Sequence, residues 1–167
     1  MKKWICVLLL CGAAVVLGRS MPFARHDVAQ LVPVEALVVS LENGTIVLDG
    51  GDCRGTGATW EDAWEDLLHG AEGTAFLSTT EYIVLSGGAV NLLPKVAWSE
   101  ELRPAAAVCT SLGNIPEADK TAKYLSAHPS DVTLNHVRAA LLQEERIQLP
   151  VLVETGGGLR LYGTIDR

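Results

Sequence analysis

The sequence predicts an α/β domain, or an α+β domain, in which helices pack on a mixed β-sheet. Three observations lead to this fold class. Two apolar, β-branched runs flank an Asn-Gly pair, an amphipathic helical pattern follows them, and two more apolar runs lie on either side of a short helical segment. These runs span, in order, residues 34–41, 45–49, 59–69, 82–86, 90–98 and 105–112. We therefore expect an N-terminal β-hairpin followed by a central helix–strand–helix–strand unit from Thr59 to Leu112.

Length and composition indicate one globular domain. The chain has 167 residues, of which 49% are hydrophobic and 20% charged, and this balance is typical of folded rather than disordered proteins. A chain of this length suits a single domain once an exported leader is removed. We expect the domain to cover residues 34–167, preceded by a flexible N-terminal segment at 21–33.

Residues 1–20 have the pattern of a secretory signal peptide. Lys2 and Lys3 form a positive start, Trp4–Leu17 is a continuous apolar run, and small residues at Gly18 and Ser20 suit cleavage after Ser20. The apolar run is shorter than the roughly 20 residues that a membrane-spanning helix needs. A cleaved signal peptide is therefore favoured over an uncleaved anchor or a buried core segment, and the leader is of a bacterial type.

Attachment through a lipid is disfavoured by the position of the cysteines. A lipoprotein signal places a cysteine directly after a small residue at the end of the apolar run, and here Arg19 stands at that place. Cys11 lies earlier and follows Leu10, a poor residue for the position before cleavage. We expect an exported protein, secreted or at the outer face of a bacterial membrane, whose association with that membrane is indirect or through an uncleaved leader.

The charge of the chain argues against nucleic acid as a partner. Lys2, Lys3 and Arg19 account for three of the 13 basic residues and lie in the leader. The rest of the chain has 10 basic and 20 acidic residues, a formal net charge of −10, and no basic stripe. An acidic body repels phosphate backbones, so nucleic-acid binding is excluded from the expected functions.

Cys53 and Cys109 are the cysteines that remain after the leader. Outside the cytosol they have the chance to form one disulfide. Cys109 lies in an Ala-Ala-Ala-Val-Cys run, where a free cysteine behaves as a small buried hydrophobe, and free thiols are the favoured interpretation. Two distant cysteines without clustered histidines do not predict a metal site.

The first hairpin turn is well marked. Asn43 and Gly44 supply the two positive-φ positions of a type I′ turn between the runs 34–41 and 45–49. Asn43-Gly44-Thr45 also matches the acceptor pattern for N-glycosylation, but the turn explains these residues without a sugar.

The glycine-rich stretch from Gly50 to Ala58 precedes the first helix. Such a position can cradle a phosphate, but the stretch has neither the lysine of a P-loop nor a GxGxxG spacing. Glu61 and Asp62 already occupy the positive end of the helix that follows. A flexible connector is predicted in preference to an anion site.

The helix over 59–69 has clear start and face signals. Thr59 is the predicted N-cap, and Asp62 three residues later resembles a capping box. The apolar face follows helical spacing and consists of Trp60, Ala63, Trp64, Leu67, Leu68 and Ala71. We interpret the two tryptophans as core residues rather than as a platform for a ligand.

The central strands are predicted to be parallel neighbours. Residues 82–86 and 105–112 are buried-type runs, and the segment between them contains Pro94, which a helix tolerates only in its first turn. A strand–helix–strand connection brings the two strands together in parallel with a right-handed crossover.

The C-terminal third predicts two helices and a second hairpin. Pro116 suits the first position of one helix, and Ser130 is the expected cap of the next, whose inward residues are Leu134, Val137 and Leu141. Strands are expected at 149–154 and 159–165, with the glycines at 156–158 in the turn.

His128 and His136 are too far apart for a metal pair on one helical turn and are interpreted as surface residues.

The sequence predicts no enzyme. It contains no nucleophile elbow, no HExxH, no CxxC and no kinase or Walker pattern. The acidic pairs Glu100-Glu101 and Glu144-Glu145 are adjacent in sequence, as on a solvated surface. We expect no catalytic residue, no bound metal and no cofactor.

Several short sequence stretches, together with the order of the predicted elements, resemble the N-terminal domain of the Ger(x)C family. The members of this family are the C-subunits of the nutrient-germinant receptors of spore-forming bacteria. In that family a leader and a β-hairpin precede a helix, a strand, a short helix and a Glu-Leu-Arg-like approach to the next strand. The resembling stretches, within residues 34–165, are Trp60–Leu68, Tyr82–Gly87, Glu101–Arg103 with Ala105–Cys109, Leu149–Leu152, and Gly163-Thr164. The chain departs from the family in having Arg19 in place of a lipidated cysteine.

The resemblance implies a non-enzymatic, extracytoplasmic domain that acts by protein–protein association in spore germination. Its implied partners are the integral membrane subunits of a germinant receptor. The resemblance supplies no catalytic, cofactor-binding or metal-binding residue.

Two other hypotheses remain open from the sequence. An exported solute-binding or interaction domain unrelated to germination would be favoured by a pocket lined by Trp60, Trp64 and Trp98, or by the Gly51–Gly57 loop. An exported hydrolase with a dispersed site would be favoured by a serine bonded to His128 or His136.

Overall fold

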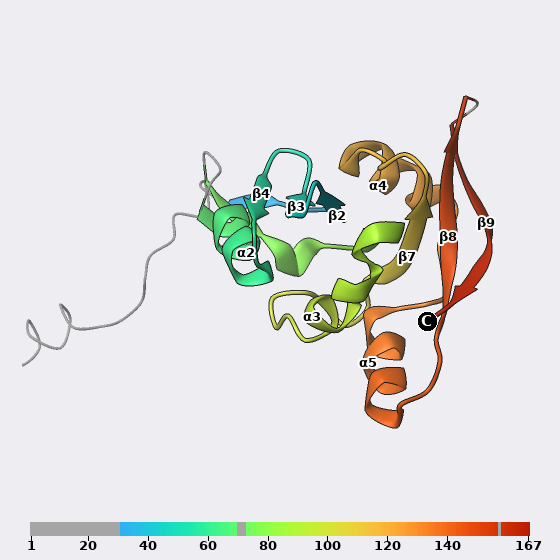
Figure 1. Cartoon of the computed structure of the whole chain (residues 1–167). Coiled ribbons are helices and arrows are strands. Elements are labelled where there is room, and N and C mark those ends of the chain that lie inside the picture. Colours follow the sequence, from blue (N-terminus) through green and yellow to red (C-terminus); the bar gives the residue numbers. More distant parts are fainter. Residues whose placement is uncertain (1–30, 70–72, 157) are drawn as a thin grey trace, which may run out of the picture.

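The computed structural model describes residues 31–69, 73–156 and 158–167, and the expected leader at 1–20 and the segment 21–30 lie outside these ranges. The described residues form a mixed seven-stranded β-sheet with helices packed against it (Figure 1), which confirms the predicted fold class. None of the helices in these ranges is long and apolar enough to cross a bilayer.

The strands are β1 (Leu31–Pro33), β2 (Ala36–Glu42), β3 (Thr45–Asp49), β4 (Arg54–Gly57), β5 (Thr74–Phe76), β6 (Tyr82–Ser86), β7 (Ala107–Leu112), β8 (Gln148–Thr155) and β9 (Gly158–Asp166). The α-helices are α2 (Trp60–His69), α3 (Leu93–Ala97), α4 (Ala118–Ala127) and α5 (Leu134–Gln143). Two 3₁₀ segments, η2 (Leu77–Thr79) and η3 (Gly87–Leu92), precede β6 and α3.

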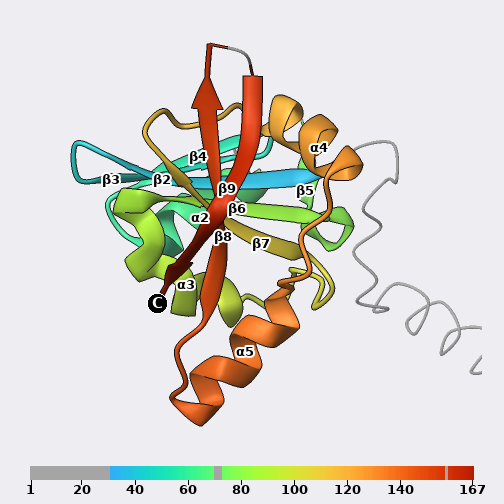
Figure 2. The same ribbon diagram turned by 90° about the vertical axis from the view of Figure 1, so that its right-hand side faces the viewer.

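The main sheet has the strand order β4-β3-β2-β6-β7-β8-β9. Its four central strands, β2, β6, β7 and β8, run parallel, and the pairs at both ends of the sheet are antiparallel. Strand twist accumulates across the sheet, so that β8 and β9 cross the direction of β2 at a large angle (Figure 2). The short strands β1 and β5 pair in parallel as a separate two-stranded sheet.

Two hydrophobic cores lie on opposite faces of the main sheet, because successive side chains of a strand point to opposite faces. The larger core lies between the sheet and helices α2, α3 and α5, and includes Leu37, Leu67, Ile83, Val108 and Val137. The smaller core lies under α4 and includes Val38, Val84, Cys109, Ala122 and Leu125. In Figure 1, α4 lies above the sheet and the other α-helices below it.

The first hairpin and its turn are confirmed. β2 and β3 pair antiparallel up to Glu42 and Thr45, and the turn residues Asn43 and Gly44 have φ values of 51° and 84°. Positive φ at both positions is what a type I′ turn requires, and an Asn-Gly pair adopts it at low cost.

The prediction of a flexible connector at Gly50–Ala58 is wrong for Arg54–Gly57. These residues form β4, which pairs with β3 at the edge of the sheet. Glycines weaken a strand signal, and here Gly55 and Gly57 are needed because α2 packs directly on the backbone of β4. The N-terminal segment was likewise expected to be flexible to residue 33, but Leu31–Pro33 form β1.

The central unit is confirmed with shifted boundaries. β6 is buried along its whole length and pairs in parallel with β7, which begins at Ala107 rather than at residue 105. The expected helix over 90–98 starts earlier, as the 3₁₀ segment η3, and continues as α3 with Pro94 in its first turn. The hand of the crossover stays a prediction.

The N-terminal caps of α2, α4 and α5 can be compared with the helix starts predicted from the sequence. The backbone N–H of Asp62 donates to Oγ1 of Thr59 at 3.2 Å, which confirms the cap of α2. α5 is capped by Thr133 and not by Ser130, because Thr133 forms a reciprocal capping box with His136. α4 begins at Ala118 with Glu117 as its N-cap, so Pro116 lies before the helix rather than in its first turn.

The C-terminal hairpin is confirmed as β8 and β9, which pair antiparallel from Gln148 and Asp166 to Thr155 and Gly158. Gly158 belongs to β9 rather than to the turn, and Gly157 lies outside the described residues.

Cys53 and Cys109 are both free and buried, which confirms the favoured interpretation. They cannot pair in this fold, because Cys53 belongs to the core under α2 and Cys109 to the core under α4, with the sheet between them.

Burial of Cys109 predicts an alkaline loss of stability. Removal from water raises the pKa of the Cys109 thiol from 9.0 to about 11. The folded state therefore keeps a proton that the unfolded chain releases first, and we expect the free energy of unfolding to fall, by up to about 2 kcal/mol, as pH rises from about 9 to about 11. Urea titrations across this range measure the decline. A Cys109→Ala variant should show a shallower one, and an equal slope in both proteins would contradict the assignment.

Candidate functional site

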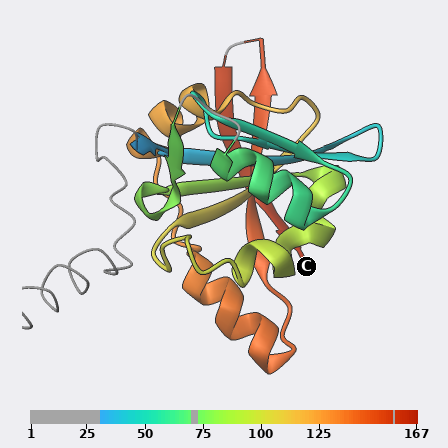
Figure 3. The same cartoon turned by 90° about the vertical axis from the view of Figure 1, so that its left-hand side faces the viewer.

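An open groove of about 930 Å³ lies between α2 and α3. The two helices lie side by side on the same face of the sheet (Figure 3). One wall consists of Trp60, Glu61, Trp64, Glu65, Leu68 and His69 from α2, and the other of Asn91, Pro94, Lys95, Trp98, Ser99, Glu100 and Glu101. The volume lies within the range that ligand sites of proteins usually have.

The floor of the groove is aromatic. Trp60 is 8% exposed and belongs to the larger core, and Trp64 is half-buried against that core. Their rings stack with centroids 5.1 Å apart and planes 29° apart. The four-residue spacing on one helix brings them together, since residues at i and i+4 are neighbours on a helix surface. The pair is thus anchored in the core and presents apolar surface to the groove.

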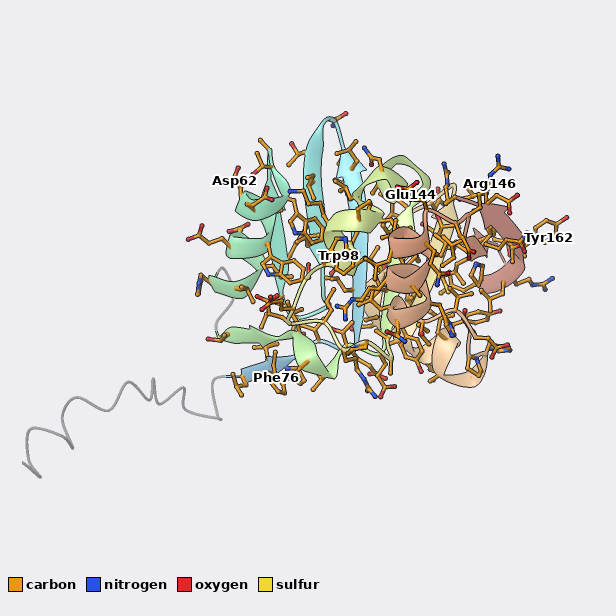
Figure 4. All side chains as sticks on the ribbon, turned by 90° about the horizontal axis from the view of Figure 1, so that it is seen from below. Asp62, Phe76, Trp98, Glu144, Arg146 and Tyr162 are labelled. Atoms are coloured by element: carbon orange, nitrogen blue, oxygen red, sulfur yellow. The ribbon has the colours of Figure 1, made fainter. Side chains whose placement is uncertain are left out.

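Trp98 adds a third indole from the other wall. It is the C-cap residue of α3, and its backbone N–H donates to the Pro94 carbonyl at 3.1 Å. Its side chain is 53% exposed, which is a large exposed fraction for a tryptophan. In Figure 4, Trp98 lies between α2 and α5 on the face that carries both helices.

Arg138 of α5 holds the segment that carries Trp98. Its Nε donates to the Ala97 carbonyl at 2.5 Å, and its Nη2 donates to the Ser99 carbonyl at 3.1 Å. One guanidinium therefore binds the carbonyls on both sides of Trp98 at the negative end of α3. Ser99 adds a hydrogen bond from its hydroxyl to the Lys95 carbonyl at 3.0 Å.

Replacing Arg138 with alanine should loosen the wall that carries Trp98. Two hydrogen bonds from a charged donor are lost, and we expect a destabilisation of about 1–3 kcal/mol, measured by urea unfolding. Hydrogen exchange should show faster opening around residues 97–99, because these carbonyls lose their anchor. Arg138→Lys keeps the charge but offers one donor nitrogen in place of two, and should recover part of the loss. Unchanged exchange in Arg138→Ala would contradict this role.

The rims of the groove are acidic. Glu61 accepts a hydrogen bond from Lys95 across the groove, and this bond lowers the pKa of the Glu61 carboxyl. Glu65, Glu100 and Glu101 also line the groove and have no ion-pair partner among the described residues. Three carboxylates with no ion-pair partner in the described ranges therefore border the apolar floor, and the lysine that lines the groove, Lys95, is already paired with Glu61.

The residues singled out in the sequence lie at several places in the fold. The interpretation of the Trp60–Trp64 pair as core holds for Trp60, and both rings also line the groove. The Gly51–Gly57 stretch does not line it. His128 stacks on Tyr124, and His136 belongs to the cap of α5.

No serine hydroxyl is bonded to a histidine ring among the described residues, so the hydrolase hypothesis gains no support there. The same residues include no group of three histidine, cysteine, aspartate or glutamate side chains placed to hold a metal ion.

Together, the fold and the groove define a small α/β domain with an aromatic, acid-rimmed surface groove. No protein-family model, no curated protein and no solved structure matches the chain.

Proposed function

We propose that this chain is a non-enzymatic, exported binding domain that acts by protein–protein association in spore germination, as its resemblance to the Ger(x)C family implies. Its proposed partners are the integral membrane subunits of a germinant receptor, at the outer face of a bacterial spore membrane. The proposal requires the helix–strand–helix–strand unit at 59–112, and this unit is present as α2, β6, η3 with α3, and β7.

The two C-terminal stretches that resemble the family, Leu149–Leu152 and Gly163-Thr164, also support the proposal, because they are neighbours in the fold. Pro150 of β8 lies opposite Thr164 of β9 in the antiparallel pair. Two short resembling stretches, separate in sequence, are thus parts of one hairpin.

The observation that carries a binding role is the groove, and above all the exposure of Trp98. Burying an indole normally stabilises a protein by a few kcal/mol. A half-exposed tryptophan beside two others therefore marks a surface where contact with a partner would lower the free energy by removing apolar area from water. The rim carboxylates that have no ion-pair partner among the described residues make a positively charged partner more favourable than a negatively charged one.

A pull-down from sporulating cells tests the proposal, with residues 21–167 as bait. Recovery of integral germinant-receptor subunits is the expected result. Recovery of no such subunit by a folded, monodisperse bait would refute the germination role.

The groove specifically favours one second candidate, an exported solute-binding domain. Its volume and its three indoles suit a small organic molecule as well as a protein segment. A screen that follows tryptophan fluorescence during titration tests this candidate, because Trp98 reports directly on occupancy of the groove. A solute that binds wild type and not Trp98→Ala would establish it.

A further inference from the structure

We propose that the groove between α2 and α3 binds a basic amphipathic helix of a partner protein. The apolar stripe of that helix lies on the indoles, and its lysine and arginine side chains reach the carboxylates of both rims. This inference rests on the proposed function by association and names the chemistry of the partner.

The length of the groove fits a helix. Its lining residues on α2 run from Trp60 to His69, the whole of that ten-residue helix. At 1.5 Å per residue this wall is about 14 Å long, and its part beyond the Lys95–Glu61 bond that joins the two walls, from Trp64 to His69, spans about 8 Å, or between one and two turns of a partner helix. An amphipathic helix laid in an apolar groove is one of the recurring modes of peptide recognition.

The charges on the rims select a cationic partner. Glu61 and Glu65 lie one turn apart on α2, and Glu100 and Glu101 follow Trp98 on the opposite wall. Lys95 is the lysine of the groove and is already paired with Glu61. A helix with basic residues on both flanks of its apolar stripe meets carboxylates on both sides, whereas an acidic helix is repelled.

The arrangement of the indoles argues against a small organic cation as the occupant. A cage for a quaternary ammonium group needs ring faces turned toward one point from several sides. Here Trp60 and Trp64 stack on each other, so each has one face turned to its neighbour, and Trp98 stands on the other wall. The rings form an extended floor, which suits a row of aliphatic side chains.

A synthetic peptide tests the proposal even though the natural partner is unidentified. The probe is a fluorescein-labelled 18-residue peptide, about five helical turns, with leucines at helical spacing and lysine or arginine on both flanks. One control peptide has the same composition in scrambled order, and another has glutamate on the flanks. The full chain is produced in an exporting host and purified as that host delivers it, and binding is followed by fluorescence anisotropy near physiological salt.

Matched variants locate the binding. Trp98→Ala removes an exposed indole of the groove, and Tyr162→Ala removes an aromatic side chain that is 79% exposed on β9. Glu100→Gln with Glu101→Gln removes two groove charges, and Glu144→Gln with Glu145→Gln removes an adjacent acidic pair outside the groove. Figure 4 shows Tyr162 well away from Trp98.

We expect Trp98→Ala to weaken binding by about 10-fold or more, as for a central aromatic residue of an interface. The Glu100/Glu101 variant should weaken it by roughly 3- to 10-fold and reduce its salt dependence. Both control variants should stay within about twofold, because Tyr162, Glu144 and Glu145 do not line the groove.

Four results would overturn the inference. These are equal losses in groove and control variants, equal affinity for the scrambled peptide, displacement of the probe by millimolar tetramethylammonium, and no binding of the probe. The pull-down with Trp98→Ala as bait separates this inference from the proposed function. Receptor subunits recovered equally by wild type and variant would leave association standing and reject the groove as its surface, while recovery by neither would reject association itself.

Discussion

Replacing Gly55 with alanine is expected to destabilise the domain by about 3 kcal/mol or more. A Cβ atom at this position would lie 2.3 Å from the Ala63 carbonyl oxygen and 2.4 Å from the Leu67 backbone nitrogen. Both contacts are to the backbone of α2, so no side-chain rotation relieves them. The helix must move off β4, and the core contacts of Leu67 are lost with it.

The measurement is urea unfolding of Gly55→Ala beside Gly88→Ala. A Cβ at Gly88 meets nothing within 4 Å, and this glycine has no positive φ, so its replacement should change the free energy of unfolding by less than about 0.5 kcal/mol. Gly57→Ala provides a second test, since its Cβ would lie 2.4 Å from the Ala63 nitrogen. Wild-type stability in Gly55→Ala would mean that α2 does not pack directly on the backbone of β4.

Replacing Trp60 with alanine is the second large effect, at about 3–5 kcal/mol. Trp60 is buried in the larger core while its ring stacks on Trp64, so the substitution leaves a cavity and an unsupported neighbour. Loss of the ring also removes part of the groove floor. Stability and peptide binding should therefore fall together in this variant.

Trp98→Ala is the matched control, because the same chemical change is made at a side chain that is 53% exposed. It should lower the free energy of unfolding by less than about 1 kcal/mol while weakening binding of the basic peptide. Trp60→Phe keeps an aromatic ring in the core and should recover much of the stability. If Trp98→Ala destabilised the domain as much as Trp60→Ala, Trp98 would be a structural residue rather than a binding one.

Local signals in the sequence predicted most of the elements correctly. The Asn43-Gly44 turn, the Thr59 cap and the buried run of β6 are each determined by a few contiguous residues. Their physics is short-range: a positive φ, one hydrogen bond to a helix end, and an apolar segment with no polar face. Such signals act before any tertiary contact forms, and this is why they can be read from the chain.

Signals that depend on a distant partner were read incorrectly or incompletely. The Gly50–Ala58 stretch was predicted to be a connector because glycines usually mark loops, but Gly55 and Gly57 form β4 as α2 approaches them. Ser130 was the expected cap of α5, but Thr133 takes that role, at the point where a bridge to Ala107 and the hydrogen bond from the Leu134 N–H to the Ala106 carbonyl hold the chain against β7. At both positions the local sequence is compatible with more than one structure, and a tertiary contact determines which of them forms.

The sequence by itself determined a small acidic α/β domain, the order of the elements in its central unit and the burial of Cys109, because these follow from composition and from periodicity along the chain. Only the tertiary structure decided that Trp98, 34 residues after Trp64, stands across a groove from it. The carboxylates of α2 and of the α3 wall become two rims for the same reason. A site made from two helices exists only once β6 and the sheet have placed those helices side by side, and no local pattern encodes that placement.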